Sequence, residues 1–523
     1  MAGADPTVLP TYADTVVLGG GTAGAAIAAR LAERSDQSVL LLEAGPDYGP
    51  RAAGRWPRAL LDPRSMPVDL HSWGYVSSSR YGAPGLALER ARVIGGCSSH
   101  NACAAVWGHR LDYDGWAALG NPGWEMDALL PLFHEANRKL RVSIPRPEEL
   151  TPWHQACLEA GPGAGFPFRV NMNDVDLTHG IATSPINVAE GTRWNTAFGY
   201  LDAVRERPTL TIRGEVLADR LVLRSGRAVG VDVVGPGGAA RVEAGRVVVS
   251  CGAYGSPLLL QRSGIGDPAD LGPLGIETLH PLPGVGKNLQ EHVVILLLYP
   301  GTAELTAAMA AFEAAGGDMR EDALNVLARS SYAEGGVFDL HLYPMITRAA
   351  GSWAGDRFKG QHTWLIGIGP GVLTPRSRGS VTATGRDPEA RPRIDHAYFS
   401  DPEDRDLAVL LDGVELSRAL AAQPPLDRLL GPALAPAADL GRVALADYIR
   451  ANSSHAYHPV GSCMMGPASD RLAVVDARGA VHGLEGLYVA DASIMPRVPR
   501  ANTNLPTLVA AEKIAALLLE RAG

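Results

Sequence analysis

A glycine-rich segment near the start of the chain constrains the fold more than any other feature. An apolar run at residues 15–18 leads into the sequence GGGTAG at residues 19–24, and residues 25–33 have a helix-like composition. Gly19 and Gly21 suit a tight turn at which the backbone approaches a pyrophosphate, and Gly24 lets the helix pack closely on the strand. Phosphates would lie at the helix N-terminus, where free amides and the helix dipole attract anions. The segment predicts a strand, turn and helix that bind a dinucleotide.

A carboxylate stands where such a unit binds ribose. A second apolar run at residues 39–42 ends at Glu43, about twenty residues after the turn, where an acidic side chain accepts from ribose hydroxyls and disfavours a 2'-phosphate. The alternative is a glycine-rich turn in an ordinary α/β unit, but the strand, helix and Glu43 together favour dinucleotide binding. The motif alone does not separate FAD from NAD.

Composition limits the class of protein and its partners. The chain has 523 residues, of which 46% are hydrophobic, so we expect a large globular protein with two domains or one domain with a large insertion. The net charge is −9 and the 47 basic residues are dispersed, which argues against nucleic acid as a partner. No run approaches the roughly 18 apolar residues of a membrane span, so we expect a soluble, cytoplasmic protein. The five cysteines lack CxxC spacing, which argues against a disulfide framework and a metal site.

Four further segments carry glycine-rich or histidine-containing patterns. They are residues 92–101 (RVIGGCSSHN) with 112–116 (DYDGW), residues 251–257 (CGAYGSP) with 261–266 (QRSGIG), residues 284–292 (GVGKNLQEH), and the C-terminal set 457–463 (YHPVGSC), 489–493 (VADAS) and 502–507 (NTNLPT).

Together with the first segment, these patterns resemble the glucose-methanol-choline (GMC) family of flavin oxidoreductases along nearly the whole chain. The resemblance implies FAD rather than NAD as the cofactor. It also implies an α/β fold, with a Rossmann-type FAD-binding domain at residues 1–155, 200–293 and 452–523 and an inserted α+β substrate-binding domain at 156–199 and 294–451. The FAD-binding residues that it implies are Gly19, Gly21, Thr22, Ala23, Gly24, Glu43, Trp73, Gly96, His100, Asn101, Val216, Asp491, Ala492 and Thr503.

Local patterns are compatible with this architecture. Residues 209–212, 228–234 and 245–250 have the β-branched content of strands. Residues 235–238 (GPGG) predict a hairpin turn. The region 423–439, rich in alanine and proline, predicts a surface loop or short helices.

The resemblance places catalysis on two C-terminal side chains. Oxidising an alcohol removes the hydroxyl proton and transfers a hydride from the same carbon to flavin N5, and a histidine suits the proton transfer because its pKa lies near neutrality. The resemblance puts His458 at this position. The second position, His or Asn in the family, falls on Asn504, and Asn502 is the alternative. An amide cannot take a proton at neutral pH, so His458 is the expected base. Asn504 could instead cap a helix from residue 508.

His100 follows the Ser98–Ser99 pair, as in the choline oxidase branch of the family, where this histidine is bonded to the 8-methyl carbon of the flavin. The resemblance therefore implies a covalent histidyl-FAD, a link that would make the flavin a stronger oxidant; the alternative is a noncovalent histidine packed against the ring. Residues 491–496 and 501–507 are closer to the hydroxymethylfurfural and aryl-alcohol oxidases. Four carboxylates compete as the group that would bind a quaternary ammonium: Glu304, Glu313, Glu321 and Glu334.

The expected activity is oxidation of a small-molecule alcohol to an aldehyde or ketone, with reduced flavin reoxidised by O2, a quinone or another carrier. The competing functions are a non-redox hydroxynitrile lyase, a fatty-acid photodecarboxylase, and a flavin-carrying binding protein without turnover.

Overall fold

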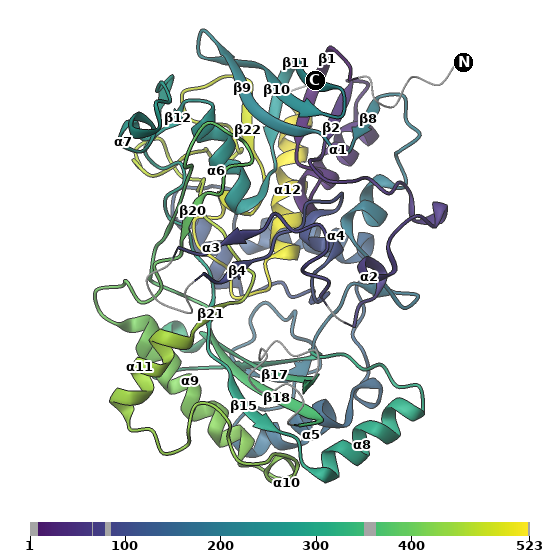
Figure 1. Cartoon of the computed structure of the whole chain (residues 1–523), viewed down its shortest axis with the longest axis vertical. Helices are drawn as coiled ribbons and strands as arrows, with labels where there is room; N and C mark the ends of the chain where they lie inside the picture. Colours follow the sequence, from purple (N-terminus) through teal and green to yellow (C-terminus); the bar gives the residue numbers. More distant parts are fainter. Residues whose placement is uncertain (1–8, 65, 79–84, 350–361, 521–523) are drawn as a thin grey trace.

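The computed structural model describes residues 9–64, 66–78, 85–349 and 362–520. Its elements form two sheets with separate helical layers, one at each end of the long axis (Figure 1). The helices are α1 (Thr22–Arg34), α2 (Arg58–Leu61), α3 (Arg110–Ala118), α4 (Met126–Lys139), α5 (Pro152–Ala160), α6 (Gly252–Arg262), α7 (Pro268–Leu271), α8 (Ala303–Ala314), α9 (Arg405–Ala421), α10 (Leu426–Leu429), α11 (Arg442–Asn452) and α12 (Asn504–Glu520).

The first sheet has the strand order β8-β2-β1-β11-β10-β9, with β22 beside β11. Strands β8, β2, β1, β11 and β22 are parallel, and β10 and β9 extend the sheet in antiparallel register. Parallel strands joined through helices are the arrangement of dinucleotide-binding folds. The strands are β1 (Tyr12–Leu18), β2 (Val39–Leu42), β8 (Leu210–Arg213), β9 (Leu217–Arg224), β10 (Arg227–Gly235), β11 (Gly238–Val249) and β22 (Leu487–Val489).

Helix α1 lies at the centre of this half. Residues 22–32 are buried without interruption, against the sheet and against α12. Six alanines in this stretch keep the helix thin, and no charged side chain other than Arg30 has to be buried with it. Arg30 is neutralised by Glu512 of α12, whose carboxylate lies 2.7 Å away. An ion pair removed from water in this way needs such close partners.

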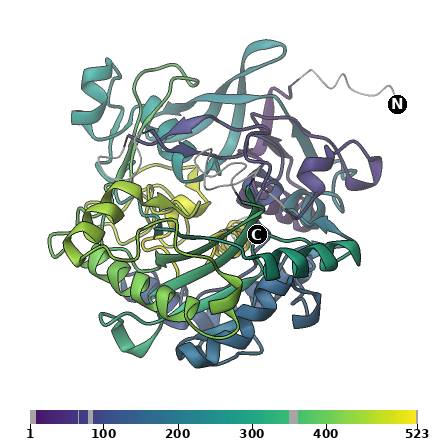
Figure 2. The same cartoon turned by 60° about the horizontal axis from the view of Figure 1, so that its bottom comes forward.

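The second sheet is antiparallel, with the order β21-β14-β18-β17-β16-β5 and β15 beside β18. Helices α5 and α9 pack on one face, and Figure 2 brings this helical layer forward. The other face is turned towards the first half of the molecule. The strands are β5 (Gly180–Thr183), β14 (Val293–Val294), β15 (Leu297–Pro300), β16 (Leu324–Ala328), β17 (Leu340–Arg348), β18 (Trp364–Val372) and β21 (Ser454–His455).

Four two-stranded sheets complete the strands of the described chain. They are β3 (Tyr75–Val76) with β4 (Ala87–Leu88), β6 (Val188–Ala189) with β7 (Thr192–Arg193), β12 (Ile265–Gly266) with β13 (His280–Pro281), and β19 (Ser380–Thr382) with β20 (Arg393–Asp395).

The two sheets draw on different parts of the chain. Every strand of the first sheet lies in the ranges 1–155, 200–293 and 452–523 expected for FAD binding. Strands β5 and β15–β18 lie in the ranges 156–199 and 294–451 expected for the substrate domain. Strand β21, at residues 454 and 455, pairs with β14 of the second sheet although it falls in the first set of ranges. We propose these residue ranges as the two domains, with β21 as the segment where the chain passes from one sheet to the other.

The described part of the chain has no helix that is both long enough and apolar enough to cross a membrane.

Candidate active site

The glycine-rich turn forms a narrow cradle between β1 and α1. Gly19 has φ +93°, a left-handed conformation that favours glycine, and Gly21 directly precedes the helix. A Cβ at Gly24 would lie 1.8 Å from the Gly19 carbonyl oxygen, so a larger residue would push the helix off the turn. Gly24 is therefore a packing residue, as its position in the motif predicts. The amides at the start of α1 are left free for an anion.

Glu43 lies at the carboxyl end of β2, beside this turn. One carboxylate oxygen accepts from the Gly20 amide and the other from the Gly45 amide, both at 2.8 Å. The side chain is 5% exposed, and burial raises its pKa despite these bonds. Each oxygen keeps a further lone pair, and the residue lines the large cavity described next. Glu43 thus holds the turn in place as well as facing the cavity.

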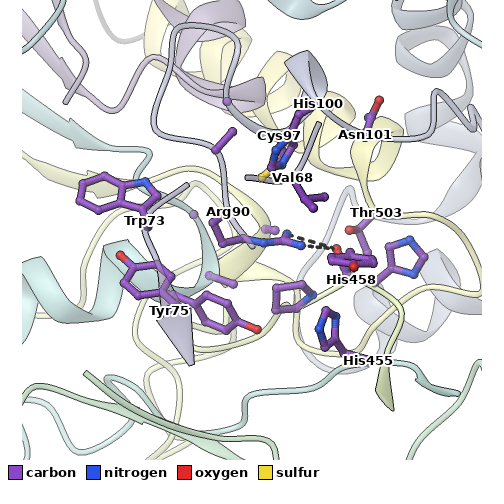
Figure 3. Close-up of a pocket in the computed structure, with 18 of the residues that line it drawn as sticks. Val68, Trp73, Tyr75, Arg90, Cys97, His100, Asn101, His455, His458 and Thr503 are labelled. Carbon is purple, nitrogen blue, oxygen red and sulfur yellow. Dashed lines mark hydrogen bonds between the residues drawn. The ribbon is translucent and has the colours of Figure 1, made fainter. Parts of the chain in front are cut away.

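A cavity of about 850 Å³ runs from this turn to the inward face of the second sheet. Every site residue predicted from the sequence lines it except Gly24. Figure 3 shows part of the wall, with Trp73 and Tyr75 at one end and His455 and His458 at the other. The remaining predicted residues come from distant segments: Gly19, Gly21, Thr22, Ala23, Glu43, Gly96, His100, Asn101, Val216, Asp491, Ala492, Thr503 and Asn504.

His458 lies between two polar partners. Its Nε2 is 3.1 Å from the Asn502 amide nitrogen, and its Nδ1 is 2.9 Å from Nδ1 of His292. Burial, followed by the nearby His292 and Arg90, lowers the pKa of His458 well below its usual range. The ring is therefore neutral. If Nε2 accepts from the amide of Asn502, the proton is on Nδ1 and is donated to His292.

The two asparagines of residues 502–504 face different parts of the cavity. The Asn502 side chain contacts His458, the position that the sequence assigned to Asn504. Asn504 is the first residue of α12; its Oδ1 accepts from the Thr22 hydroxyl at 3.1 Å, and its Nδ2 has no partner within the described residues. The register differs because α12 begins at residue 504 rather than 508, so Asn504 lies at the α1 end of the cavity.

His100 lies at the end of a 3-10 helix (Gly96–Ser99) and is 4% exposed. Its Nδ1 is buried and has no hydrogen-bond partner in the described ranges. Cys97 is next to it in Figure 3. Burial alone would raise the pKa of the Cys97 thiol, but Arg90 and His100 outweigh burial and lower it to about 6. His100 is thus placed in the cavity wall with an unused ring nitrogen.

Asp491 ties the C-terminal segment to α6. Its Oδ2 accepts from the Gly252 amide at 2.8 Å and from the Ser256 hydroxyl at 2.5 Å, and burial raises its pKa. Ala492 follows and lines the cavity. Val216 donates its amide to the Glu43 carbonyl at 2.9 Å, which brings β9 to the same end as the glycine turn.

The sequence analysis assigned no role to three polar residues that lie around His458. Glu291 accepts from the His458 amide at 2.8 Å, and burial raises the pKa of Glu291 to about 8. Burial lowers the pKa of His292 to about 4. Arg90 donates to the Tyr457 carbonyl at 3.1 Å, the contact drawn in Figure 3. Glu291 and His292 belong to the segment 284–292, so the sequence showed their motif. Their contact with His458 could not be predicted, because only the folded chain brings the two segments together.

Comparisons with known proteins agree with the fold. Two family models, both described as GMC oxidoreductase, match residues 13–294 and 375–511. An oxygen-dependent choline dehydrogenase of Paraburkholderia phytofirmans is 36% identical over 532 residues, which cover 96% of this chain and 93% of that protein. One from Chromohalobacter salexigens is 34% identical over 535 residues, with 96% and 94% covered. Crystalline pyridoxine 4-oxidase from Mesorbium loti superposes with a TM-score of 0.85 at 29% identity and covers 97% of this chain and 99% of that one.

The residues present fit FAD, the cofactor that these enzymes use. The glycine cradle leaves amides free for phosphates, Glu43 faces the cavity beside it, and the volume is adequate for a large cofactor and a small substrate. The chain therefore belongs to the GMC oxidoreductase family, as a flavin oxidoreductase that acts on alcohols.

Proposed function

We propose that this chain oxidises an alcohol to an aldehyde or ketone, with His458 taking the hydroxyl proton. The observation that carries the proposal is a neutral, buried histidine paired with an amide in the cavity that also contains the glycine cradle. Bound FAD supplies the two-electron acceptor for the hydride that leaves the alcohol carbon.

The contacts of His458 suit this role. Nε2 is the basic nitrogen when Nδ1 donates to His292, and an alcohol hydroxyl that takes the place of the Asn502 amide at the single Nε2 lone pair would pass its proton there. The Asn502 amide would donate to the alcohol oxygen and stabilise negative charge as it develops. Glu291 fixes the backbone of His458. Together these contacts hold the ring in one tautomer and one orientation.

We propose that FAD is held at three places. Gly19, Gly21 and the first amides of α1 would bind the pyrophosphate, and Glu43 the ribose. At the other end, a His100 ring nitrogen would replace one hydrogen of the flavin 8-methyl group, a two-electron oxidation in which the flavin itself would take up the electrons and then pass them to O2 or another acceptor. The place of His100 in the cavity wall, in the segment that resembles the flavin-linked relatives, supports this link.

The names of the relatives indicate which alcohols and which final electron acceptors to test first. Choline and pyridoxine, which appear in the names of the relatives, are the first alcohols to test, together with aryl and furanic alcohols. O2 is the first acceptor to test because several relatives are named oxygen-dependent; a quinone is the second.

The test is anaerobic mixing of the FAD-loaded protein with each alcohol, followed by air. We expect loss of the oxidised flavin absorbance with at least one alcohol, and its return when an acceptor is admitted. If every alcohol left the flavin oxidised, the proposal would be wrong. Cyanohydrin cleavage without bleaching would then indicate a lyase, and light-dependent loss of CO2 from a fatty acid a photodecarboxylase.

A further inference from the structure

The chain around His458 leaves the ladder of the second sheet. Val293 of β14 pairs with His455 of β21 in antiparallel register, and an uninterrupted ladder would place His458 opposite Gln290. Gln290 pairs instead with Val460, through two amide-to-carbonyl hydrogen bonds of 3.0 Å. This part of the chain thus has two more residues than the segment opposite, which makes it a β-bulge. Bulges beside active sites re-aim a side chain, here that of His458.

The bulge contains a strained residue. Tyr457 has φ +66°, in the left-handed region that bulky side chains rarely occupy. Pro459, two residues later, has no N–H to return to the ladder. A conformation of this kind persists only where the surrounding contacts determine it. The rest of the structure therefore has to hold the peptide between Tyr457 and His458.

Two side chains from different segments bind that peptide at its two polar groups. Both terminal nitrogens of Arg90 donate to the Tyr457 carbonyl at 3.1 Å. The Glu291 carboxyl accepts from the His458 amide at 2.8 Å. Neither of these peptide groups has a backbone partner in the part of the chain that the structure describes. Because the carbonyl and the amide belong to one planar unit, the donor and the acceptor together fix its orientation.

Arg90 and Glu291 have few other contacts that would explain their position. The Nε of Arg90 donates to the Glu89 carbonyl at 2.6 Å, its guanidinium lies 5.9 Å from the centre of the Tyr457 ring, and it forms no ion pair among the described residues. Figure 3 shows this side chain extending towards His458. Glu291 is 3% exposed, and burial raises its pKa to about 8. Packing alone accounts for neither a partly buried arginine without an acidic partner nor a buried carboxyl, since desolvation of both costs free energy.

We propose that Arg90 and Glu291 are positioning residues, which together hold the bulge peptide so that the ring of His458 faces the cavity. Nε2 of that ring then lies beside the Asn502 amide. The inference rests on the proposed role of His458 as the base in alcohol oxidation. Without either contact, Tyr457 relaxes out of the left-handed region and the imidazole turns with the peptide. Neither positioning residue has to touch the substrate or FAD, and neither takes a proton in this role.

The first experiment measures the anaerobic rate of flavin reduction at saturating alcohol in FAD-loaded protein. Arg90→Met removes both donors to the Tyr457 carbonyl, and we expect the rate to fall about 10- to 100-fold, the loss caused by a displaced catalytic group. The alcohol concentration that gives half the limiting rate should change less. Arg90→Lys keeps a donor and should recover most of the rate. Arg246→Met is the matched control and should reduce at the wild-type rate, because Arg246 also donates to three neutral acceptors but does not line the cavity.

A double variant shows whether Arg90 acts through His458. In His458→Ala there is no ring to aim, so adding Arg90→Met should cause no further loss of rate. A further loss of about tenfold or more would mean that the guanidinium acts on the flavin or the substrate itself, and would overturn the inference. Glu291→Leu and Glu291→Gln repeat the test at the amide: the leucine variant should be slow, and the glutamine variant, which keeps an acceptor, should retain most of the rate. This second pair gives the answer if Arg90→Met does not fold.

Crystal structures of Arg90→Met and Glu291→Leu test the geometry without any substrate. We expect φ of Tyr457 to become negative and Nε2 of His458 to move away from the Asn502 amide nitrogen, which lies 3.1 Å from it in the unaltered chain. A positive φ and an unchanged contact in both variants would overturn the inference.

The two proposals fail in different ways. If no alcohol reduces the wild-type flavin, the proposed oxidation is wrong, and the crystal structures still decide whether Arg90 and Glu291 hold the peptide. If an alcohol reduces the wild-type flavin and Arg90→Met and Glu291→Leu react at the same rate as the wild type, the positioning role is wrong and the oxidation stands.

Discussion

The hydrogen bonds of Glu43 allow us to predict how much FAD affinity is lost when its carboxylate is replaced. The carboxylate accepts two backbone amides at 2.8 Å, one from Gly20 inside the phosphate turn and one from Gly45. In Glu43→Gln one of these amides faces an NH2 group that cannot accept. A hydrogen bond to a charged group contributes about 1.5–3 kcal/mol, and every 1.4 kcal/mol is a factor of about ten in affinity. We therefore expect FAD to bind about 10- to 100-fold more weakly.

The assay is titration of the apoprotein with FAD, followed by the quenching of flavin fluorescence. Glu206→Gln, at an exposed site outside the cavity, is the matched control and should bind FAD like the wild type. Thermal melting of both apoproteins separates a local effect from loss of the fold. Wild-type FAD affinity in Glu43→Gln would refute the role given to this carboxylate.

The remaining predictions concern the flavin link and the surroundings of His458. Acid precipitation should leave flavin in the pellet of the wild type and release it from His100→Ala; release from the wild type would exclude the covalent bond. Asn502→Ala should slow flavin reduction more than Asn504→Ala, because Asn502 contacts His458; the opposite order in rapid mixing would restore the sequence assignment. Burial raises the pKa of Glu291 to about 8, so the folded protein holds this proton more tightly than the unfolded chain and loses stability between about pH 4.5 and 8. Glu291→Gln keeps an acceptor for the His458 amide and should show a smaller fall in melting temperature over this range; an equal fall would show that Glu291 is not the group that titrates.

The dinucleotide-binding half was well predicted because its signals are local. The strand expected at residues 39–42 is β2, and those at 209–212 and 228–234 correspond to β8 and β10 within one or two residues at each end. The hairpin turn at 235–238 joins β10 to β11. Each of these elements is a short run rich in apolar or β-branched residues that ends within a few residues of a glycine, so its type does not depend on distant contacts.

The sequence analysis did not predict the individual strands of the second sheet. Strand β18 includes Gly367, Gly369 and Gly371, and glycine weakens a strand pattern. Gly369 and Gly371 have a reason only in three dimensions, since a Cβ at Gly369 would lie 2.5 Å from the Leu296 side chain and one at Gly371 would lie 3.0 Å from that of Val294.

The catalytic segment shows how one structural detail changes an assignment. Asn502 and Asn504 are both polar and close to Pro506, and a helix starting at residue 508 would leave either free to face His458. Because α12 begins at Asn504, the amide of that residue is drawn to Thr22 instead. His458 itself was recognised from the motif around it, but its pairing with His292 joins segments 166 residues apart.

The central claim is that His458 takes the proton of the alcohol. The most direct measurement is the anaerobic rate of flavin reduction in His458→Ala, in protein that retains wild-type FAD content, with the best alcohol from the panel. His482→Ala, which removes a half-buried histidine outside the cavity, is the control. A positioned acid–base group contributes about 100- to 10,000-fold, so we predict at least about a hundredfold loss in His458→Ala and none in the control. Reduction of FAD-loaded His458→Ala at the wild-type rate would contradict the account.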